Sequence, residues 1–259
     1  MDMAQVVDRH DLRNVLPNAE ASHQFEGEEF GNVAVSFFWT DAPAGAGPRL
    51  HQHVYAEVFV IQDGNVTFTV GDETLEATGG QIVIAPPGVL HRFVHAGPGL
   101  SRHLDIHPTG RMNRAPTGTG REIVTTQLIQ RDSMPNSETA YRFEGREHGD
   151  VPVSFFWTDA PPGTGPTPHR HPYAEVFVIQ EGRVTFTVGE ETIAASGGEI
   201  VVVPAGTPHK FVNTGPGRSR HLDLHASGRM VTEWLEDRAA TGAPVPPLPG
   251  NTRPREGTM

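Results

Sequence analysis

The sequence contains no cysteine in 259 residues, which excludes disulfide bonds, thiolate metal sites and cysteine nucleophiles. Positive charge is also scarce, with 20 lysines and arginines against 31 acidic residues and a formal net charge of −11. This balance disfavours nucleic acid and anionic membranes as partners. No apolar run is long enough for a transmembrane helix, and the opening MDMAQVVDRH carries charges where a signal peptide needs apolar residues. We therefore expect a cytoplasmic protein that acts on a small molecule.

The residues that are abundant favour turns and short strands. The chain has 29 glycines and 23 prolines, which separate short runs of β-branched and aromatic residues. In the first half these runs lie at residues 33–40, 56–62, 66–70, 81–85 and 102–107. Many short strands with few helices predict an antiparallel sandwich or barrel. The turns Asp63-Gly64-Asn65 and Glu181-Gly182-Arg183 are typical of hairpins.

The chain is an internal duplication. Residues 31–70 match residues 149–188 at 30 of 40 positions, with an offset of 118, and the match continues through SRHLDIH and SRHLDLH. A period above 100 residues indicates duplication of a whole domain. We predict domains at residues 1–117 and 118–240, joined near the turn-rich 113–120. Residues 232–240 (TEWLEDRAA) predict a short helix, and the Pro/Gly-rich 241–259 predict a loosely packed tail.

The repeated phrases HQHVYAE and HRHPYAE carry the strongest functional signal. Residues an even number apart in a strand project from one face, so His51, His53 and Glu57 point the same way. His91 follows a Pro-Pro-Gly turn, and a neighbouring strand could bring it to the same point. A single His-x-His pair is more often a surface feature than a metal site. The second copy, however, repeats all four residues as His169, His171, Glu175 and His209. Three imidazoles and a carboxylate suit a divalent transition metal.

These residues resemble the two motifs of the cupin family. The first motif is matched by Gly45, His51, His53, Glu57 and Gly64, and the second by Gly80, Pro86, Gly88 and His91. The second copy matches with Gly163, His169, His171, Glu175 and Gly182, then Gly198, Pro204, Gly206, His209 and Asn213. The chain thus looks like a bicupin: an all-β protein of two tandem jelly-roll barrels, each with a metal site, followed by the short helix and the tail.

One position departs from the family pattern. The asparagine that follows the last ligand by four residues is present as Asn213 but is replaced by His95 in the first copy. This position is not a ligand, so we expect both copies to bind metal with different surroundings. Iron or manganese would suit oxygenase chemistry, while nickel, cobalt and zinc remain possible, because ligand type alone does not choose among them.

Residues near the ligands offer further candidates. Tyr55 and Tyr173 lie between ligands in sequence and could donate to a metal-bound oxygen. Aromatic residues that share odd numbering with the ligands would line either an apolar pocket or an ordinary core: Phe37, Trp39, Tyr55, Phe59 and Phe93, with Phe155, Trp157, Tyr173, Phe177 and Phe211. In RHLDIH we expect the polar face of His103, Asp105 and His107 to meet solvent or an interface. Alternatively His103 or Asp105 (His221 or Asp223) could be a general base.

The resemblance leaves three classes of function open, because the family includes enzymes and binding proteins. The leading hypothesis is a metal-dependent oxygenase that acts on a small aromatic or enolisable substrate, with Glu57 and Glu175 as ligands that could also take a proton. The second is redox-neutral isomerase, cyclase or lyase chemistry. The third is a non-catalytic small-molecule-binding cupin. One barrel could be catalytic and the other structural, and a monomer and a homodimer are both compatible with the sequence.

Overall fold

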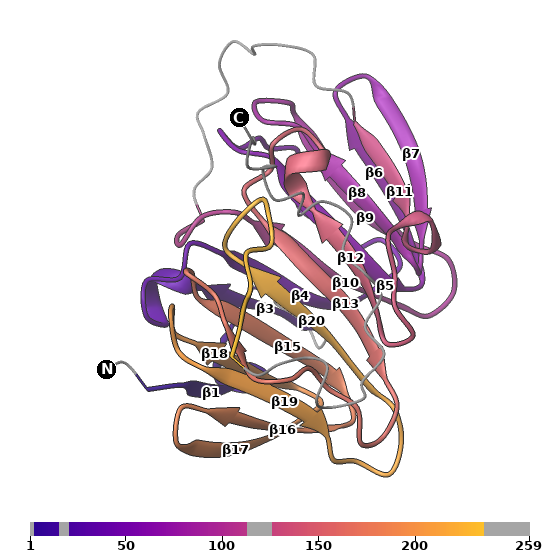
Figure 1. Cartoon of the computed structure of the whole chain (residues 1–259). Helices are drawn as coiled ribbons and strands as arrows, with labels where there is room; N and C mark the ends of the chain where they lie inside the picture. Colours follow the sequence, from indigo (N-terminus) through magenta and orange to yellow (C-terminus); the bar gives the residue numbers. More distant parts are fainter. Residues whose placement is uncertain (1–2, 16–20, 113–125, 236–259) are drawn as a thin grey trace, which may run out of the picture.

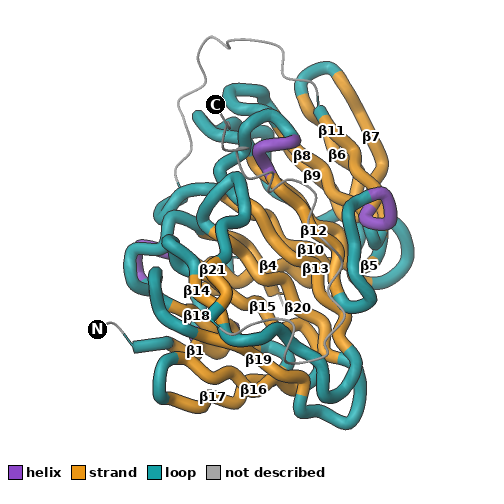
Figure 2. The backbone as a smooth tube through the Cα atoms, in the orientation of Figure 1, coloured by secondary structure: helices purple, strands orange, loops and turns teal. Residues whose placement is uncertain are grey.

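The computed structural model describes residues 3–15, 21–112 and 126–235. Within these ranges the regular elements are strands and four 3₁₀ helices of three residues each, which confirms the all-β prediction (Figure 1). Loops and turns make up the remaining described backbone (Figure 2). None of the helices in the described ranges is long and apolar enough to cross a membrane.

The elements follow the duplication. The first half contributes β1 (Gln5–Asp8), η1 (Arg9–Asp11), β2 (Arg13–Asn14), β3 (Ala21–Glu26), η2 (Gly27–Glu29), β4 (Ser36–Pro43), β5 (Glu57–Asp63), β6 (Asn65–Val70), β7 (Glu73–Thr78), β8 (Gln81–Ala85), β9 (His91–Ala96) and β10 (Leu100–His107). The second half contributes β11 (Gln127–Gln130), η3 (Arg131–Ser133), β12 (Ala140–Glu144), η4 (Gly145–Glu147), β13 (Ser154–Ala160), β14 (His169–Arg170), β15 (Glu175–Glu181), β16 (Arg183–Val188), β17 (Glu191–Ser196), β18 (Glu199–Val203), β19 (His209–Asn213), β20 (Ser219–His225) and β21 (Glu233–Trp234).

Each half builds a barrel from one large and one small antiparallel sheet. The large sheets have the orders β11-β8-β5-β10-β4-β3-β2 and β1-β18-β15-β20-β13-β12. The small sheets have the orders β7-β6-β9 and β17-β16-β19-β14-β21. In Figure 1, β6 and β7 lie at one end of the molecule and β16 and β17 at the other, with the large sheets between them. This arrangement agrees with the predicted pair of tandem barrels.

The two halves exchange edge strands. β1 from the first half pairs with β18 in the second half's large sheet, and β11 from the second half pairs with β8 in the first half's sheet. These pairings add backbone hydrogen bonds between the barrels. The predicted boundary at residues 117/118 and the linker at 113–120 lie outside the described residues, and the sheets cross that boundary in both directions.

The large sheets are buried on both faces. Along β5, Val58 and Val60 belong to a central core shared by both halves, whereas Phe59 and Ile61 belong to the core inside the first barrel. This explains the continuous apolar run VFVI, because a strand covered on two faces needs no polar alternation. The second barrel repeats the pattern with Val176, Val178, Phe177 and Ile179.

Two of the aromatic candidates in each copy do not face the barrel interior, although they share odd numbering with the ligands. Phe37 and Trp39 lie in the central core, as do Phe155 and Trp157. The register pairs Phe38 with Asp105, and Asp105 with Phe59, so the even-numbered residues of β4 face the barrel interior. Odd and even numbering therefore tracks one face only within a single strand. Phe59 and Phe93 do lie inside the first barrel, as Phe177 and Phe211 do in the second.

The predicted hairpin turns are corners between sheets. β5 pairs with β8 and β10, while β6 pairs with β7 and β9, so Gly64 connects the large sheet to the small one. Gly64 has a φ of 80°, and a Cβ there would lie 2.6 Å from Ser101 Oγ. Both constraints require glycine at this corner.

The prediction of a C-terminal helix is wrong for residues 232–235, the part of the segment that the structure describes. Glu233 and Trp234 form β21, paired with Arg170 and His169 of β14. Backbone pairing with the ligand strand overrides the local helix propensity of TEWLEDRAA. Residues 236–240 and the predicted tail at 241–259 lie outside the described residues.

Candidate metal centres

The predicted quartets converge at one end of each barrel. Site 1 comprises His51, His53, Glu57 and His91, and site 2 comprises His169, His171, Glu175 and His209. Within each site the four candidate ligand atoms lie within 4.8 Å of one another. The structure therefore brings together all eight residues that the sequence singled out as metal ligands.

Backbone pairing places these side chains. His51 and His91 form a β-bridge, with His51 N donating to His91 O at 3.0 Å and His91 N donating to His51 O at 2.7 Å. Glu57 is the first residue of β5 and His91 the first of β9, so the ligands come from the ends of both sheets. His169 and His209 pair in the same way in the second half.

The carboxylate lies at the centre of each quartet. In site 1, Glu57 Oε2 is 2.8 Å from His91 Nε2, 3.3 Å from His53 Nε2 and 3.9 Å from His51 Nε2. In site 2, Glu175 Oε2 is 2.8 Å from His209 Nε2 and 3.2 Å from His171 Nε2. The imidazole Nε2 atoms thus converge on the same carboxylate oxygen in each copy.

Carbonyl groups fix the tautomers of the ligand histidines. His51 and His91 each place Nδ1 2.8 Å from a backbone carbonyl oxygen, those of Arg49 and Val89. In site 2 the carbonyls of Thr167, Thr207 and Val231 bind the Nδ1 atoms of His169, His209 and His171. A carbonyl only accepts, so each Nδ1 must carry a proton, and Nε2 is the nitrogen left to face the site. Neutral imidazoles held in this way fit a divalent metal ion.

The charge of the quartets suits a cation. Burial lowers the pKa of His51 and His169 to about 4, so both are neutral at pH 7. Burial alone would raise the pKa of Glu57, but the neighbouring histidines outweigh it and hold the pKa well below its ordinary value. The same balance lowers the pKa of Glu175. Each site therefore offers one carboxylate and three imidazoles, and a bound metal would take the imidazoles in their neutral form, which fits the predicted divalent metal in each barrel.

The prediction that the polar face of RHLDIH is outside the barrel is wrong. His103, Asp105 and His107 are buried inside the first barrel and do not meet solvent. β10 lies between β4 and β5 in the large sheet, so its apolar residues Leu104 and Ile106 face the central core and its polar residues face the barrel. Two buried faces, one of them polar, give the same alternation in sequence as one exposed face.

His107 is the residue near site 1 that the quartet motif does not include. Its Nε2 lies 3.2 Å from Glu57 Oε1, the carboxylate oxygen that faces away from the ligand histidines. His225 Nε2 lies at the same distance, 3.2 Å, from Glu175 Oε1. The recurrence of His107 as His225, at the same offset of 118 residues as the ligands, was the available signal in the sequence.

The rest of the polar face points away from the quartets and differs between the barrels. His103 Nδ1 contacts the Asp105 carboxylate, and His221 contacts Asp223 in the same way. In the first barrel His103 Nε2 also lies 3.1 Å from His95 Nε2. Asn213, the counterpart of His95, instead donates to the carbonyls of Ala160 and Gly217, both at 2.8 Å. The two barrels therefore differ at this position, and the difference lies on the side of the barrel away from the quartets.

The two tyrosines stack on ligand histidines. The Tyr55 and His53 rings are 5.0 Å apart with 4° between their planes, and the Tyr173 and His171 rings are 5.4 Å apart with 3° between theirs. The Tyr173 hydroxyl accepts a hydrogen bond from Val231 N at 2.7 Å. Stacking and this backbone contact give Tyr173 a part in holding His171, which differs from the predicted donation to a metal-bound oxygen.

A C-terminal segment packs over site 2. This β21 segment (residues 229–235) binds His171 through the Val231 carbonyl at 2.7 Å and places the Trp234 ring 5.1 Å from the His169 ring. Arg170 also pairs with Glu233 through contacts of 2.9 and 2.7 Å. At the same offset the first copy has Gln52, Ala115 and Pro116 in place of Arg170, Glu233 and Trp234. The first copy thus lacks the side chains for these two contacts.

Apolar side chains are exposed beside the ligands of site 1. Leu50, Val54 and Leu90, here called the site 1 rim, have exposed fractions of 50%, 70% and 37%. They neighbour His51, His53 and His91 in sequence, and the second copy has Pro168, Pro172 and Pro208 at the same offset. The two sites therefore differ more in their surroundings than in their ligands.

Replacing Trp234 with alanine should increase the rate of metal loss from site 2 about tenfold, because the indole ring that packs on His169 and limits solvent access is removed. The rate can be measured by transfer of the metal to a chromophoric chelator. Leu235→Ala is the matched control, since Leu235 is an exposed neighbour on the same segment. Equal rates in the two variants would show that Trp234 does not protect the site.

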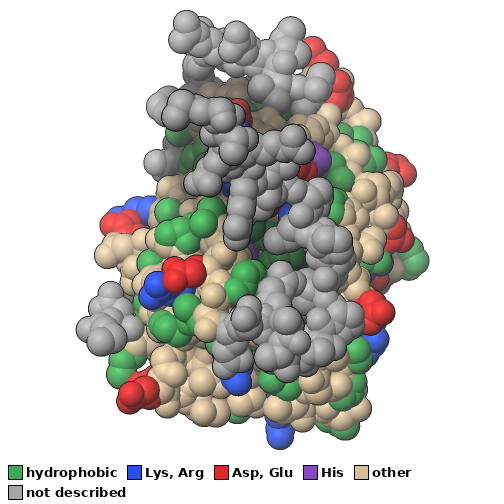
Figure 3. All heavy atoms as spheres, in the orientation of Figure 1, with side chains coloured by type: hydrophobic (Ala, Val, Ile, Leu, Met, Phe, Trp, Pro, Cys, Tyr) green, Lys and Arg blue, Asp and Glu red, His purple; other side chains and the backbone are tan. Residues whose placement is uncertain are grey.

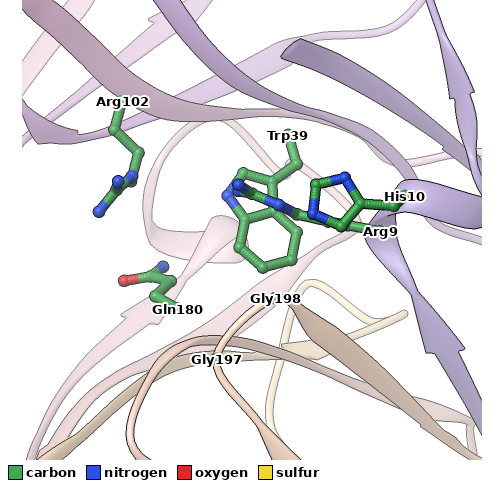
Figure 4. Close-up of a pocket in the computed structure, with 7 residues that line it drawn as sticks. All are labelled: Arg9, His10, Trp39, Arg102, Gln180, Gly197 and Gly198. Atoms are coloured by element: carbon green, nitrogen blue, oxygen red, sulfur yellow. The ribbon is translucent and has the colours of Figure 1, made fainter.

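A separate small cavity of about 150 Å³ lies between the barrels. Arg9, His10, Trp39, Arg102 and Gln180 line it together with the backbone of two glycines (Figure 4). Arg9 lies over the Trp39 ring at 5.0 Å, and both arginines pair with Asp41, at 2.9 and 2.6 Å. None of the eight quartet residues lines this cavity.

The comparisons with known proteins agree with this architecture. The family model described as a cupin domain matches residues 37–107 and again residues 155–225. The chain belongs to the cupin family. Both matches include a complete quartet, so this cupin is a bicupin with two metal sites.

Solved structures of similar fold include two oxalate decarboxylases. Bacillus subtilis oxalate decarboxylase, known for its Mn(II) centres, aligns with a TM-score of 0.75 and 16% identity over 89% of this chain and 79% of that one. The formate complex of the Lactobacillus farciminis oxalate decarboxylase aligns with a TM-score of 0.75 and 13% identity over 89% and 88%. At these identities the likeness shows the fold alone.

A curated relative matches part of the chain. An uncharacterized protein of Streptomyces coelicolor is 39% identical over 62 residues, which is 24% of this cupin and 57% of the relative. The chain thus spans little more than half of the relative's length.

Proposed function

We propose that this cupin is a metal-dependent oxygenase that acts on a small organic substrate at site 1. The observation that carries the proposal is the quartet of three imidazoles and one carboxylate beside an exposed apolar rim. Four protein ligands on a metal that prefers six leave two positions for other molecules. A divalent ion such as iron or manganese would supply Lewis acidity and redox chemistry there.

The chain's own residues define the kind of substrate. The groups nearest the Glu57 carboxylate are histidines, which come within 2.8 to 3.9 Å of it. The Leu50, Val54 and Leu90 rim suits an apolar body. Phe59, Phe68 and Phe93 fill the barrel behind the ligands and keep water from that side. A flat molecule with one ionisable oxygen, such as an enol or a phenol, fits these features.

Site 1 is preferred over site 2 because the β21 segment packs against two site 2 histidines. A substrate would have to displace Trp234 and its backbone pairing to approach from that side. Site 2 would then serve mainly to hold its barrel together through the metal.

The charge pattern supports a small molecule as the partner. The formal net charge is −11, and acidic and basic side chains are scattered over the described part of the face in Figure 3. Neither feature offers a polyanion a continuous positive surface. Whether the chain acts as a monomer or a homodimer does not alter the site, since each quartet is complete within one chain.

A redox-neutral lyase is the second candidate, and the fold shared with oxalate decarboxylases favours it. The two candidates differ in their need for oxygen. We expect protein purified without added metal to contain iron or manganese, and to consume dioxygen with a 1,3-diketone or a phenol as substrate. Turnover that is unchanged under strict anaerobiosis would select the lyase. A zinc-loaded protein would exclude the oxygenase, because zinc is redox-inert.

A further inference from the structure

Two buried histidines outside the quartets each approach a quartet glutamate. His107 and His225 are each 1% exposed, and neither ring nitrogen of either residue makes a hydrogen bond within the described parts of the chain. Leaving buried polar groups unsatisfied costs about 1–3 kcal/mol each. Packing alone would favour an apolar residue at these positions, as at the neighbouring Ile106 and Leu224.

Both histidines point at the same atom of the same ligand. The Nε2 atoms of His107 and His225 lie 3.2 Å from Oε1 of Glu57 and Glu175, respectively. The other oxygen of each carboxylate, Oε2, faces the ligand histidines. The ring of His53 lies edge-on to His107 at 4.9 Å, and the ring of His171 lies edge-on to His225 at 4.6 Å. The arrangement is therefore duplicated in full although the surroundings of the two sites differ.

We propose that His107 and His225 are positioning residues that donate Nε2–H to Oε1 and so leave only Oε2 of each glutamate to bind the metal. A carboxylate with both oxygens free can bind a cation through either or both of them. Engaging Oε1 prevents the second mode and keeps a coordination position available. The inference depends on metal binding by the quartets but not on the reaction proposed above.

The surrounding residues support this assignment. Both imidazoles are buried, and a neutral imidazole has one N–H to donate. Glu57 Oε1 is the acceptor that His107 Nε2 faces, and a neutral donor adds no charge to the site. Partners that orient metal ligands typically contribute tenfold to a hundredfold in metal affinity.

Methionine and glutamine provide a matched pair of variants, because they have similar size and only glutamine can donate a hydrogen bond. The full chain carrying His107→Met and His225→Met is compared with His107→Gln and His225→Gln after loading with Mn(II). The readouts are the Mn(II) dissociation constant by chelator competition and the zero-field splitting of the Mn(II) EPR spectrum. His103→Met with His221→Met controls for loss of a buried histidine on the same strands.

We expect Mn(II) to bind tenfold to a hundredfold more weakly to the methionine variant, with an altered EPR spectrum, whereas the glutamine variant stays close to the parent protein. The His103/His221 control should keep the parent spectrum. Unchanged affinity and spectrum in the methionine variant, or equal losses in both pairs, would overturn the proposal. Should the double methionine variant not fold, the single His107→Met chain decides, with half of the Mn(II) signal expected to change.

Discussion

Replacing His53 with alanine is expected to lower turnover more than about a hundredfold, while His171→Ala keeps most of the activity. A lost partner of a metal ligand already costs up to about a hundredfold, and the loss of a ligand should cost more. His53 lies 3.3 Å from the Glu57 carboxylate in the site with the exposed rim, whereas His171 lies in the site covered by the β21 segment. The two substitutions are chemically identical and occupy equivalent positions in the repeat.

Metal analysis separates loss of function from loss of structure. Each single variant should retain metal in its intact site, so the bound metal falls from two ions per chain to one in both proteins. Circular dichroism and thermal unfolding check that each chain is folded. Equal loss of turnover in the two variants would mean that both barrels react, and a loss confined to His171→Ala would place the reaction in site 2.

The ligand quartets were predictable because their signal is local. His51, His53 and Glu57 share one short stretch, and the repeat supplied an independent copy of every spacing. His91 required a neighbouring strand, which the cupin resemblance provided. A duplicated chain shows which polar residues recur together, and this is more informative than any one motif.

The errors arose where a residue's environment depends on strands far away in sequence. The register of β4 against β10 decides that Phe38, and not Trp39, faces the barrel interior. Placing Asp105 inside the barrel requires knowing that β10 has a strand on each side and a core on each face. The exchange of β1 and β11 and the pairing of Trp234 with His169 likewise depend on long-range contacts. Local pattern carries none of this information.

Part of the difference between the two sites is visible in the sequence. Leu50, Val54 and Leu90 are all prolines in the second copy. Only the structure shows that the proline-bordered site is also the one against which β21 packs. In the part of the chain that the structure describes, the duplicated quartets thus have unequal surroundings, with an exposed apolar rim at site 1 and the β21 segment packed against site 2.

Acidifying the metal-free protein from pH 6.5 to 4.5 is expected to lower its free energy of unfolding by at least about 3 kcal/mol. Burial depresses the pKa of several histidines in the folded chain: His51, His107, His169 and His225 to about 4, and His95 to about 3. In this window the unfolded chain binds protons that the folded chain does not, so stability falls with pH by up to about 1.4 kcal/mol per unit for each group.

Some groups act in the opposite direction. The pKa of His91 and of His209 is raised in the fold, because the hydrogen bond to the adjacent glutamate outweighs burial. Burial also raises the pKa of Asp105 and Asp223. Protonation of these four groups favours the folded state, but the five depressed histidines outnumber them. Below pH 4.5 the lowered pKa of Glu57 and of Glu175 adds a further loss of stability.

His95→Asn tests this origin of the acid sensitivity with a residue that the chain already uses at the equivalent position. Asn213 binds the carbonyls of Ala160 and Gly217 there, and the first copy has Ala42 and Gly99 at the same offset. Urea unfolding with a chelator present at pH 6.5, 5.5 and 4.5 should give a slope smaller by up to about 1.4 kcal/mol per pH unit than in the parent protein. An unchanged slope would mean that the folded chain already takes up a proton at His95, and that burial beside His103 does not keep that imidazole neutral.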